Sequence, residues 1–323
     1  MKNRKKFGAT AEDMHIDVLL SNVAMGYRPS GLIADLIFPE VTVQKQSNYF
    51  TIFTRADALR IENDDRSPGA EANEITRSMS SETYYCNNKA LKYPVTIEDK
   101  ANADPIYVQR LINGRVEFIL DKLGLGWEKR IADKVTNPAN VGSSSAVASG
   151  WVDHANADVL GDLHQGIENV KDSTGLTPNR IVFGESAWRN VRRNVEIRNI
   201  INGTNNGGGY ANMKQMEDLL EIEKVLVGGA YQNAANEAQA ESLSQIWGDN
   251  VLIYFSAEKP SMEKPSFGYS FRWKNGALPN MQVERHPYDS RKKREEVEVG
   301  YYQDEKITGA EYGFLLTAVN SST

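Results

Sequence analysis

One serine in the second half of the chain has, at first inspection, the surroundings of a catalytic nucleophile. Residues 184–188 read Gly-Glu-Ser-Ala-Trp. A nucleophile elbow reads Gly-x-Ser-x-Gly, because small residues on both sides let the chain turn sharply and expose the hydroxyl. Trp188 occupies the last position here, so the pattern fails. We therefore expect Ser186 to lie at an ordinary strand-to-helix turn, near the start of a helix.

The other patterns that could do chemistry are also incomplete. The run Gly207-Gly208-Gly209 lacks the Lys-Ser/Thr pair of a phosphate-binding loop. His164 and Glu168 share a helix face, but no third metal ligand accompanies them. We therefore predict no catalytic residue, no cofactor site and no metal site, and the sequence offers no basis for an enzyme.

Length and composition limit the alternatives further. The chain has 323 residues, of which 40% are hydrophobic and 25% charged, so it can bury a core and is not wholly disordered. A mean hydropathy of -0.50 and the lack of an apolar run near 18 residues predict no transmembrane helix. The net charge of -6 argues against a surface that wraps nucleic acid throughout. Cys86 stands alone and cannot form an internal disulfide, and no secretory signal is visible, so synthesis in the cytoplasm is expected.

Residues 41–100 are predicted to be β-structure that carries a charged excursion. Apolar residues alternate over 41–53, and a second strand is expected over 81–85. The intervening residues 55–80 have too few apolar side chains to anchor themselves to their own core. Either they form a floppy loop or another subunit orders them. The candidate inter-subunit contacts are charged residues of this excursion: Arg55, Arg60, Glu62, Asp64, Asp65, Arg66, Glu71 and Arg77.

A long amphipathic helix is predicted over 104–137. Asp104 and Pro105 suit its start, apolar residues recur at steps of three and four, and Asn137-Pro138 ends it. At 1.5 Å per residue it would be about 45–50 Å long, with a possible bend at Gly124 and Gly126. Strands late in the chain are expected to pack against it.

An alternation of helices and strands follows a linker of small residues at 139–157. The expected helices cover 158–173, 185–194 and 213–220, and the expected strands cover 180–184, 223–227 and 251–255. Further strands are expected near 267–271, 281–286, 297–302 and 314–319. Residues 202–212, rich in glycine and asparagine, should form a flexible tip.

Two basic stretches remain. Residues 1–40 are predicted to be a partly extended arm, with one or two helical turns over 13–25. The arm begins with four cations that suit either phosphate contact or a solvated tail: Lys2, Arg4, Lys5 and Lys6. The cluster 291–294 is followed by two glutamates, so a turn or an inter-subunit salt-bridge site is favoured over nucleic-acid contact.

The order of these parts resembles that of tailed-bacteriophage major capsid proteins. Residues 33–39, followed by Val41, Val43 and Lys45, resemble the arm and first strand of one group of these proteins. Residues 66–72, Arg-Ser-Pro-Gly-Ala-Glu-Ala, resemble the tip of the group's extended loop, and residues 91–95 its return. Residues 243–248 and 268–272 fit its axial lobe. The resemblance covers nearly the whole chain from about residue 16.

This resemblance implies an α+β chain with the Hong Kong 97 capsid fold. The implied parts are an N-terminal arm (1–40), an extended β-hairpin loop with its return (41–103), a peripheral domain with the spine helix (104–154 and 276–323) and an α/β axial domain (155–275). The tip of the axial domain, near 202–212 or 230–244, would point at a symmetry axis. Some members of the family cross-link their subunits, but no lysine here is assigned to such a bond.

The resemblance also implies a function and a set of partners. Copies of the chain would assemble through pentamers and hexamers into an icosahedral shell around phage double-stranded DNA, so the protein would reside in the virion after assembly in the host cytoplasm. Scaffolding, portal and decoration proteins would be further partners, DNA would be touched through weak interior contacts, and no membrane is involved. Two alternatives remain: an encapsulin-type compartment shell and a soluble α/β enzyme.

Overall fold

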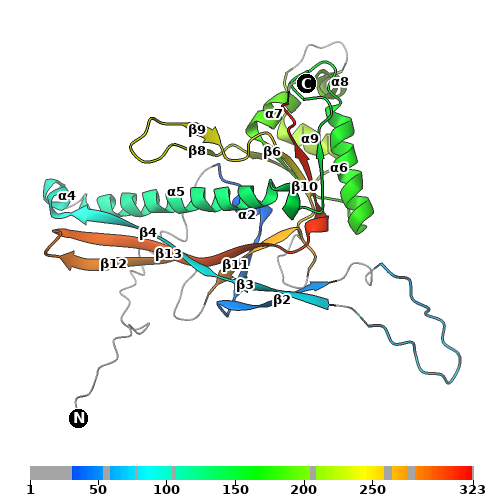
Figure 1. Cartoon of the computed structure of the whole chain (residues 1–323), viewed down its shortest axis with the longest axis horizontal. Helices are drawn as coiled ribbons and strands as arrows, with labels where there is room; N and C mark the ends of the chain where they lie inside the picture. Colours follow the sequence, from blue (N-terminus) through cyan, green and yellow to red (C-terminus); the bar gives the residue numbers. More distant parts are fainter. Residues whose placement is uncertain are drawn as a thin grey trace.

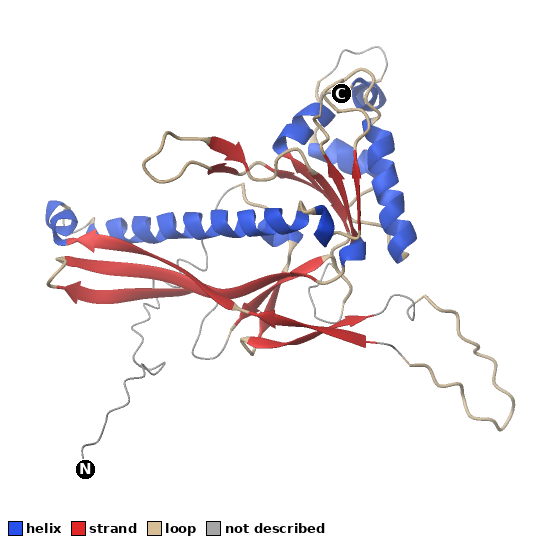
Figure 2. Cartoon of the chain, viewed as in Figure 1, coloured by secondary structure: helices blue, strands red, loops and turns tan. Residues whose placement is uncertain are grey.

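The computed structural model describes residues 31–53, 59–76, 79–103, 107–203, 209–257, 264–274 and 281–321. An elongated body, in which a long helix lies along a sheet, meets an upright α/β lobe near one end (Figures 1 and 2). Two hairpins project from these bodies. The chain is therefore a mixed α+β protein, as the sequence predicts.

Five strands form the sheet of the elongated body. Its central strand, β13 (Arg294–Ile307), pairs antiparallel with β4 (Asn87–Thr96) along one edge. Along the other edge it pairs first with β12 (Gln282–Asp289) and then with β11 (Gly268–Trp273), and β1 (Glu40–Val43) extends the sheet beside β11. The sequence predicts β-structure over 41–100 but no separate strand at 87–96, only a return segment at 91–95. The strand pattern of β4 is weak there because Lys89, Lys92 and Pro94 interrupt it.

The long helix is confirmed as α5 (Val108–Val135), which continues through Gly124 and Gly126 without interruption. Its predicted first residues, 104–106, lie outside the described residues, and Asn137 caps the following 3-10 helix η2 (Pro138–Asn140) instead. The late strands pack against α5 as predicted. The shared core consists of buried apolar residues from α5, β4, β12 and β13: Val95, Ile112, Val116, Ile119, Leu120, Leu123, Val283, Val297, Val299 and Tyr301.

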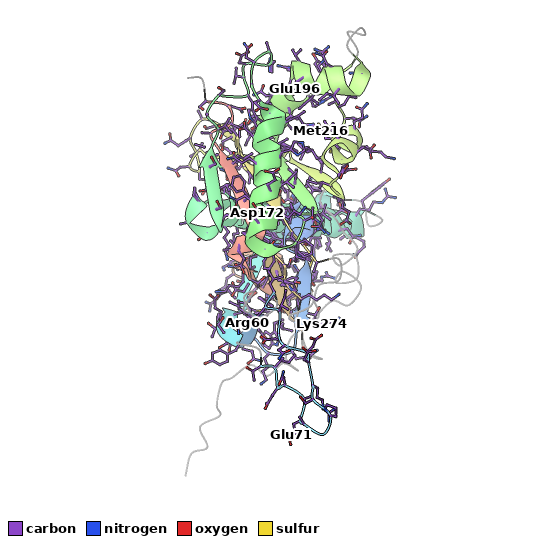
Figure 3. The ribbon with its side chains drawn as sticks, turned by 90° about the vertical axis from the view of Figure 1, so that its right-hand side faces the viewer. Arg60, Glu71, Asp172, Glu196, Met216 and Lys274 are labelled. Atoms are coloured by element: carbon purple, nitrogen blue, oxygen red, sulfur yellow. The ribbon has the colours of Figure 1, made fainter. Side chains whose placement is uncertain are left out.

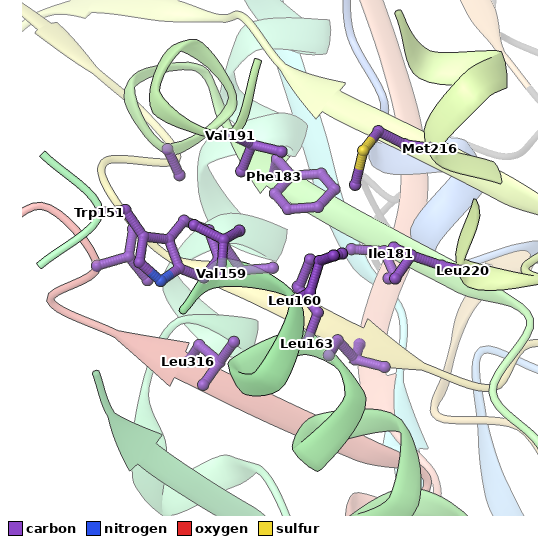
Figure 4. Close-up of a cluster of buried hydrophobic side chains, with 14 of the residues drawn as sticks. Trp151, Val159, Leu160, Leu163, Ile181, Phe183, Val191, Met216, Leu220 and Leu316 are labelled. Carbon is purple, nitrogen blue, oxygen red and sulfur yellow. The ribbon is translucent and has the colours of Figure 1, made fainter. Parts of the chain in front are cut away.

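The α/β alternation predicted for the second half forms the lobe. Its sheet has the order β5-β14-β10-β6-β7, with β6 (Arg180–Gly184), β7 (Lys224–Gly228) and β10 (Val251–Tyr254) where strands are predicted. Trp151, Val159, Leu163 and Phe183 are among the residues of its buried core (Figure 4). The helices are α6 (Val159–Thr174), α7 (Glu185–Val191), α8 (Val195–Asn202), which was not predicted, and α9 (Met213–Leu220).

The expected linker 139–157 contains an edge strand of the lobe. Residues Ser143–Ala146 form β5, which runs parallel to β14 (Gly313–Thr317). An edge strand is held by main-chain hydrogen bonds and needs no run of apolar side chains. The serine-rich sequence of β5 therefore gave no strand signal. Both β5 and β14 lie outside the predicted axial segment 155–275, whereas β11, inside that segment, joins the other sheet. The sheets therefore cross the predicted domain limits.

Two hairpins project from these bodies. The predicted β-run over 41–53 is two strands, β1 and β2 (Ser47–Phe53), and β2 pairs with β3 (Met79–Tyr85). The second hairpin joins β8 (Tyr231–Asn233) and β9 (Leu243–Gln245). The remaining short elements are α2 (Ala34–Ile37), α4 (Ile97–Asn102) and η3 (Ala310–Tyr312). None of the described helices is long and apolar enough to cross a membrane.

The basic cluster 291–294 lies at the turn between β12 and β13. The turn confirms one of the two favoured interpretations. The glutamates that follow it pair within the chain: Glu295 lies 2.6 Å from Lys100, and Glu296 lies 2.7 Å from Lys92. These ion pairs account for the two glutamates, whereas an inter-subunit salt bridge formed by the basic cluster stays a prediction.

Candidate functional site

The charged excursion forms a long exposed loop beyond the β2–β3 hairpin. Residues 59–76 contain neither helix nor strand and are all exposed, and the loop extends away from both bodies (Figure 1). In Figure 3, Arg60 lies near the base of the loop and Glu71 near its far end. Six of the predicted contact residues lie there and are exposed: Arg60, Glu62, Asp64, Asp65, Arg66 and Glu71. The other two, Arg55 and Arg77, lie outside the described residues.

A few local hydrogen bonds shape the tip of this loop. The Ala70 N–H donates to the Ser67 carbonyl at 3.1 Å, and Arg66 Nε donates to the Ala70 carbonyl at 2.6 Å. Pro68 and Gly69 occupy the centre of this turn, and Gly69 has φ +82°, which favours glycine. The Arg60–Glu62 pair, 4.0 Å apart and exposed, contributes little. The loop therefore has a defined tip without a core of its own.

The loop also exposes apolar side chains. Ile61 is 97% exposed and Ile75 is 73% exposed. Isolated exposed apolar residues are ordinary, but these two lie on a projection that offers them no core. Burying each against a partner would contribute about 1.5–3 kcal/mol. The loop is thus suited to bind another surface.

The stem of the loop is fixed to the elongated body by aromatic packing. Phe50 of β2 and Tyr84 of β3 lie 5.2 and 4.8 Å from the ring of Phe271 in β11. Cys86 is buried beside them, and burial raises the pKa of its thiol to about 11. A thiol that stays protonated at neutral pH is a poor nucleophile, so Cys86 has a structural role.

The residues with incomplete chemical patterns take ordinary structural positions. Ser186 lies in the first turn of α7, as predicted, and its hydroxyl donates to the Gly248 carbonyl at 2.9 Å. His164 and Glu168 are exposed on α6. Over the described ranges, no group of three or more His, Cys, Asp or Glu side chains is placed to hold a metal ion.

The sequence analysis missed one buried acidic residue, Glu128 of α5, which is fully buried. Its Oε2 accepts from the backbone N–H groups of Ile33 and Ala34 at 2.9 and 2.8 Å. Its Oε1 accepts from Trp247 Nε1 at 2.6 Å. Burial raises the pKa of this carboxyl against the lowering effect of the three donors. Glu128 therefore joins α5 to the start of α2 and to the lobe, and no sequence signal distinguishes it from exposed glutamates.

Comparison with known proteins finds relatives that match this chain over nearly its whole length and over nearly the whole of their own. No family model matches the chain. Two curated relatives are named major capsid protein: one from Burkholderia phage BcepMu is 24% identical over 94% of this chain and 97% of its own, and one from Pseudomonas phage JBD67 is 26% identical over 93% and 96%.

Solved structures share the fold. A phage-related protein from Bordetella bronchiseptica RB50 matches with a TM-score of 0.76 at 24% identity, covering 95% of this chain and 98% of its own. The capsid structure of the cyanophage P-SCSP1u matches with a TM-score of 0.57 at 13% identity, covering 92% and 90%. At these identities the structural match speaks for the fold alone, and the whole chain takes part in it.

Proposed function

We propose that this chain is a phage major capsid protein, copies of which self-assemble into the shell of the virion. The carrying observation is the match to two phage major capsid proteins across more than nine-tenths of both chains. The fold that the chain shares with the capsid structure of the cyanophage P-SCSP1u is consistent with this function. The relatives are named for a structural part of the particle rather than for a reaction, which agrees with the absence of an enzyme signature in the sequence.

The finer arrangement is that of the Hong Kong 97 capsid fold. In this proposal α5 is the spine helix of the peripheral domain, the lobe is the axial domain, and the β2–β3 hairpin with residues 59–76 is the extended loop. The long helix on a sheet, the separate α/β lobe and the projecting hairpin support this assignment. Because β5, β14 and β11 pair across the segment limits, the proposal assigns the parts by sheet rather than by those limits.

The loop is the proposed contact with neighbouring copies. Each exposed ion pair formed there contributes only about 0–1 kcal/mol, whereas burial of Ile61 and Ile75 would contribute about 1.5–3 kcal/mol each. The apolar pair therefore provides most of the affinity. The charged residues 60–71 set the register between copies through many weak contacts that symmetry repeats.

DNA and accessory proteins are further proposed partners. The shell would enclose double-stranded DNA without binding it tightly, which agrees with the net negative charge of -6. Scaffolding, portal and decoration proteins belong to the same proposal, as does assembly from pentamers and hexamers in the host cytoplasm. An encapsulin-type shell has less support than a phage capsid, because both sequence relatives are phage proteins.

Negative-stain electron microscopy and light scattering of the purified chain test the proposal. Closed shells or rings of subunits are expected. A chain that stays monomeric across salt and concentration, and also when produced together with the neighbouring genes of its phage, would contradict it.

Variants of the loop test the contact separately from the shell. The double substitution Ile61→Asp/Ile75→Asp is expected to weaken assembly about 100-fold or more, because two apolar contacts are lost. Val152→Asp is the control, since Val152 is also an exposed apolar residue (48%) but lies in neither hairpin and in no proposed contact. If the double variant assembles as well as the wild type, the proposed contact of the loop with neighbouring copies is wrong, while the shell proposal still stands.

A further inference from the structure

The half of α5 that Figure 1 shows farthest from the lobe carries a groove with aromatic and basic lining residues. We call it the α5 groove. It is lined by one residue of β4 and five of α5: Tyr93, Arg110, Leu111, Gly114, Arg115 and Phe118. Phe118 is 49% exposed, and a Cβ added at Gly114 would meet nothing within 4 Å. The groove is therefore open to solvent at Gly114 and Phe118, and Leu111 and Phe118 give it apolar surface.

One of its cations, Arg115, is held in place by its neighbours. Arg115 stacks on the ring of Tyr93, 4.3 Å from the centroid, and its Nη1 donates to the Tyr93 hydroxyl at 2.7 Å. Its Nη2 lies 3.9 Å from the Asp99 carboxylate, and its side chain is still 30% exposed. A further carboxylate in the groove could therefore pair with a guanidinium that is already held in place.

The N-terminal segment has the matching chemistry. Its apolar residues stand at 16, 19, 20 and 23, the spacing of one helical face. Its acidic residues Glu12, Asp13 and Asp17 gather at one end of that pattern, and 13 and 17 are one turn apart. An acidic amphipathic helix has the charge opposite to that of Arg110 and Arg115, and its apolar face would cover Leu111 and Phe118 of the α5 groove.

The residues that link the N-terminal segment to Ile33 are long enough to let that segment reach the α5 groove of its own chain. Glu128 ties the backbone at Ile33 and Ala34 to α5. Arg110 precedes Glu128 by five full turns of 3.6 residues, so the groove begins on the same side of α5. Gly114 lies about 21 Å from Glu128 along the axis, and residues 26–32 can span about 24 Å when extended.

We propose that residues 12–25 dock as an amphipathic helix in the α5 groove of their own chain, with the acidic residues meeting Arg110 and Arg115. The loop 59–76 of a second copy is also acidic. It has no helical apolar face, however, and no tether that raises its concentration at the groove to the millimolar range. This contact would brace the arm along the spine of each subunit, and it is independent of shell assembly.

Disulfide trapping in the full chain tests the proposal. In a Cys86→Ser background, the pair Leu20→Cys/Gly114→Cys is expected to form an internal disulfide about tenfold faster, or more, than Leu20→Cys/Gly209→Cys. Gly209 is the matched control because it too is an open glycine, on the lobe. Non-reducing gels and mass spectrometry separate bonds within a chain from bonds between chains.

Charge reversal provides the second measurement. Adding Arg110→Glu/Arg115→Glu to the trapped pair is expected to slow its closure about tenfold at low salt, and adding Glu12→Arg/Asp17→Arg as well should restore it. Equal rates for the test and control pairs would overturn the proposal. So would a disulfide mainly between chains, or faster trapping of Ile61→Cys with Gly114→Cys, because either would place a second copy in the groove.

Discussion

Replacing Glu128 with glutamine should loosen the junction of α5, α2 and the lobe. The carboxylate accepts two backbone N–H groups on one oxygen and the Trp247 N–H on the other. Glutamine keeps the shape but offers one oxygen and one amide NH₂. In either orientation the NH₂ group faces a donor, so at least one buried N–H loses its acceptor.

The magnitude follows from that lost acceptor. The less costly orientation leaves only the Trp247 N–H unsatisfied, which costs about 1–3 kcal/mol. This is a substantial part of a typical stability of about 5–15 kcal/mol. Urea unfolding of the unassembled chain measures it as a lower midpoint at constant slope. Glu168→Gln on the exposed face of α6 is the control and should change the stability by less than about 0.5 kcal/mol.

The pH dependence of this difference has a definite sign. Burial holds the pKa of Glu128 above its ordinary value near 4.5. A raised folded-state pKa contributes stability that is fully present below the unfolded value and is lost as pH rises through the folded value. Glutamine does not titrate, so the destabilisation by Glu128→Gln should be larger near pH 4.5 than at pH 8. A gap that widens toward neutral pH would refute the reasoning, since the three donors would then outweigh burial.

Three further substitutions and treatments test other parts of the structure. Gly184→Ala should destabilise the lobe by about 1–3 kcal/mol in urea unfolding, because its Cβ would lie 2.2 Å from the Gly248 carbonyl oxygen; an unchanged midpoint would contradict this packing. Gly69→Ala should leave stability unchanged within about 1 kcal/mol yet alter the loop tip, because φ is +82° there; an unchanged hydrogen-exchange rate at 66–70 would count against the turn. Cys86 should react with a thiol reagent at pH 8 at least about 100-fold more slowly than in urea-unfolded chain, given its pKa of about 11, and rapid labelling of the folded chain would show that the thiol is accessible.

Local patterns in the sequence predicted the elements that bury one regular face. The three- and four-residue spacing identified α5, and the alternation of helical and apolar segments identified α6, β6, β7 and β10. The lack of apolar residues in the excursion indicated that residues 59–76 would find no core of their own. Each of these properties depends on residues close together in the chain, so periodicity alone reveals it.

The tertiary structure decided the contacts between distant segments. Ser143–Ala146 became an edge strand because β14 offers main-chain hydrogen bonds there, and β4 became a full strand because β13 runs beside it. Glu128 contacts residues 95 and 119 positions away. No local pattern marks such a partner, since a glutamate has the same helix propensity whether its carboxylate faces water or three buried donors. The sequence by itself thus determined which segments form regular elements and which one remains exposed. Only the folded chain determined which of them meet, because those contacts depend on packing between segments far apart in the chain.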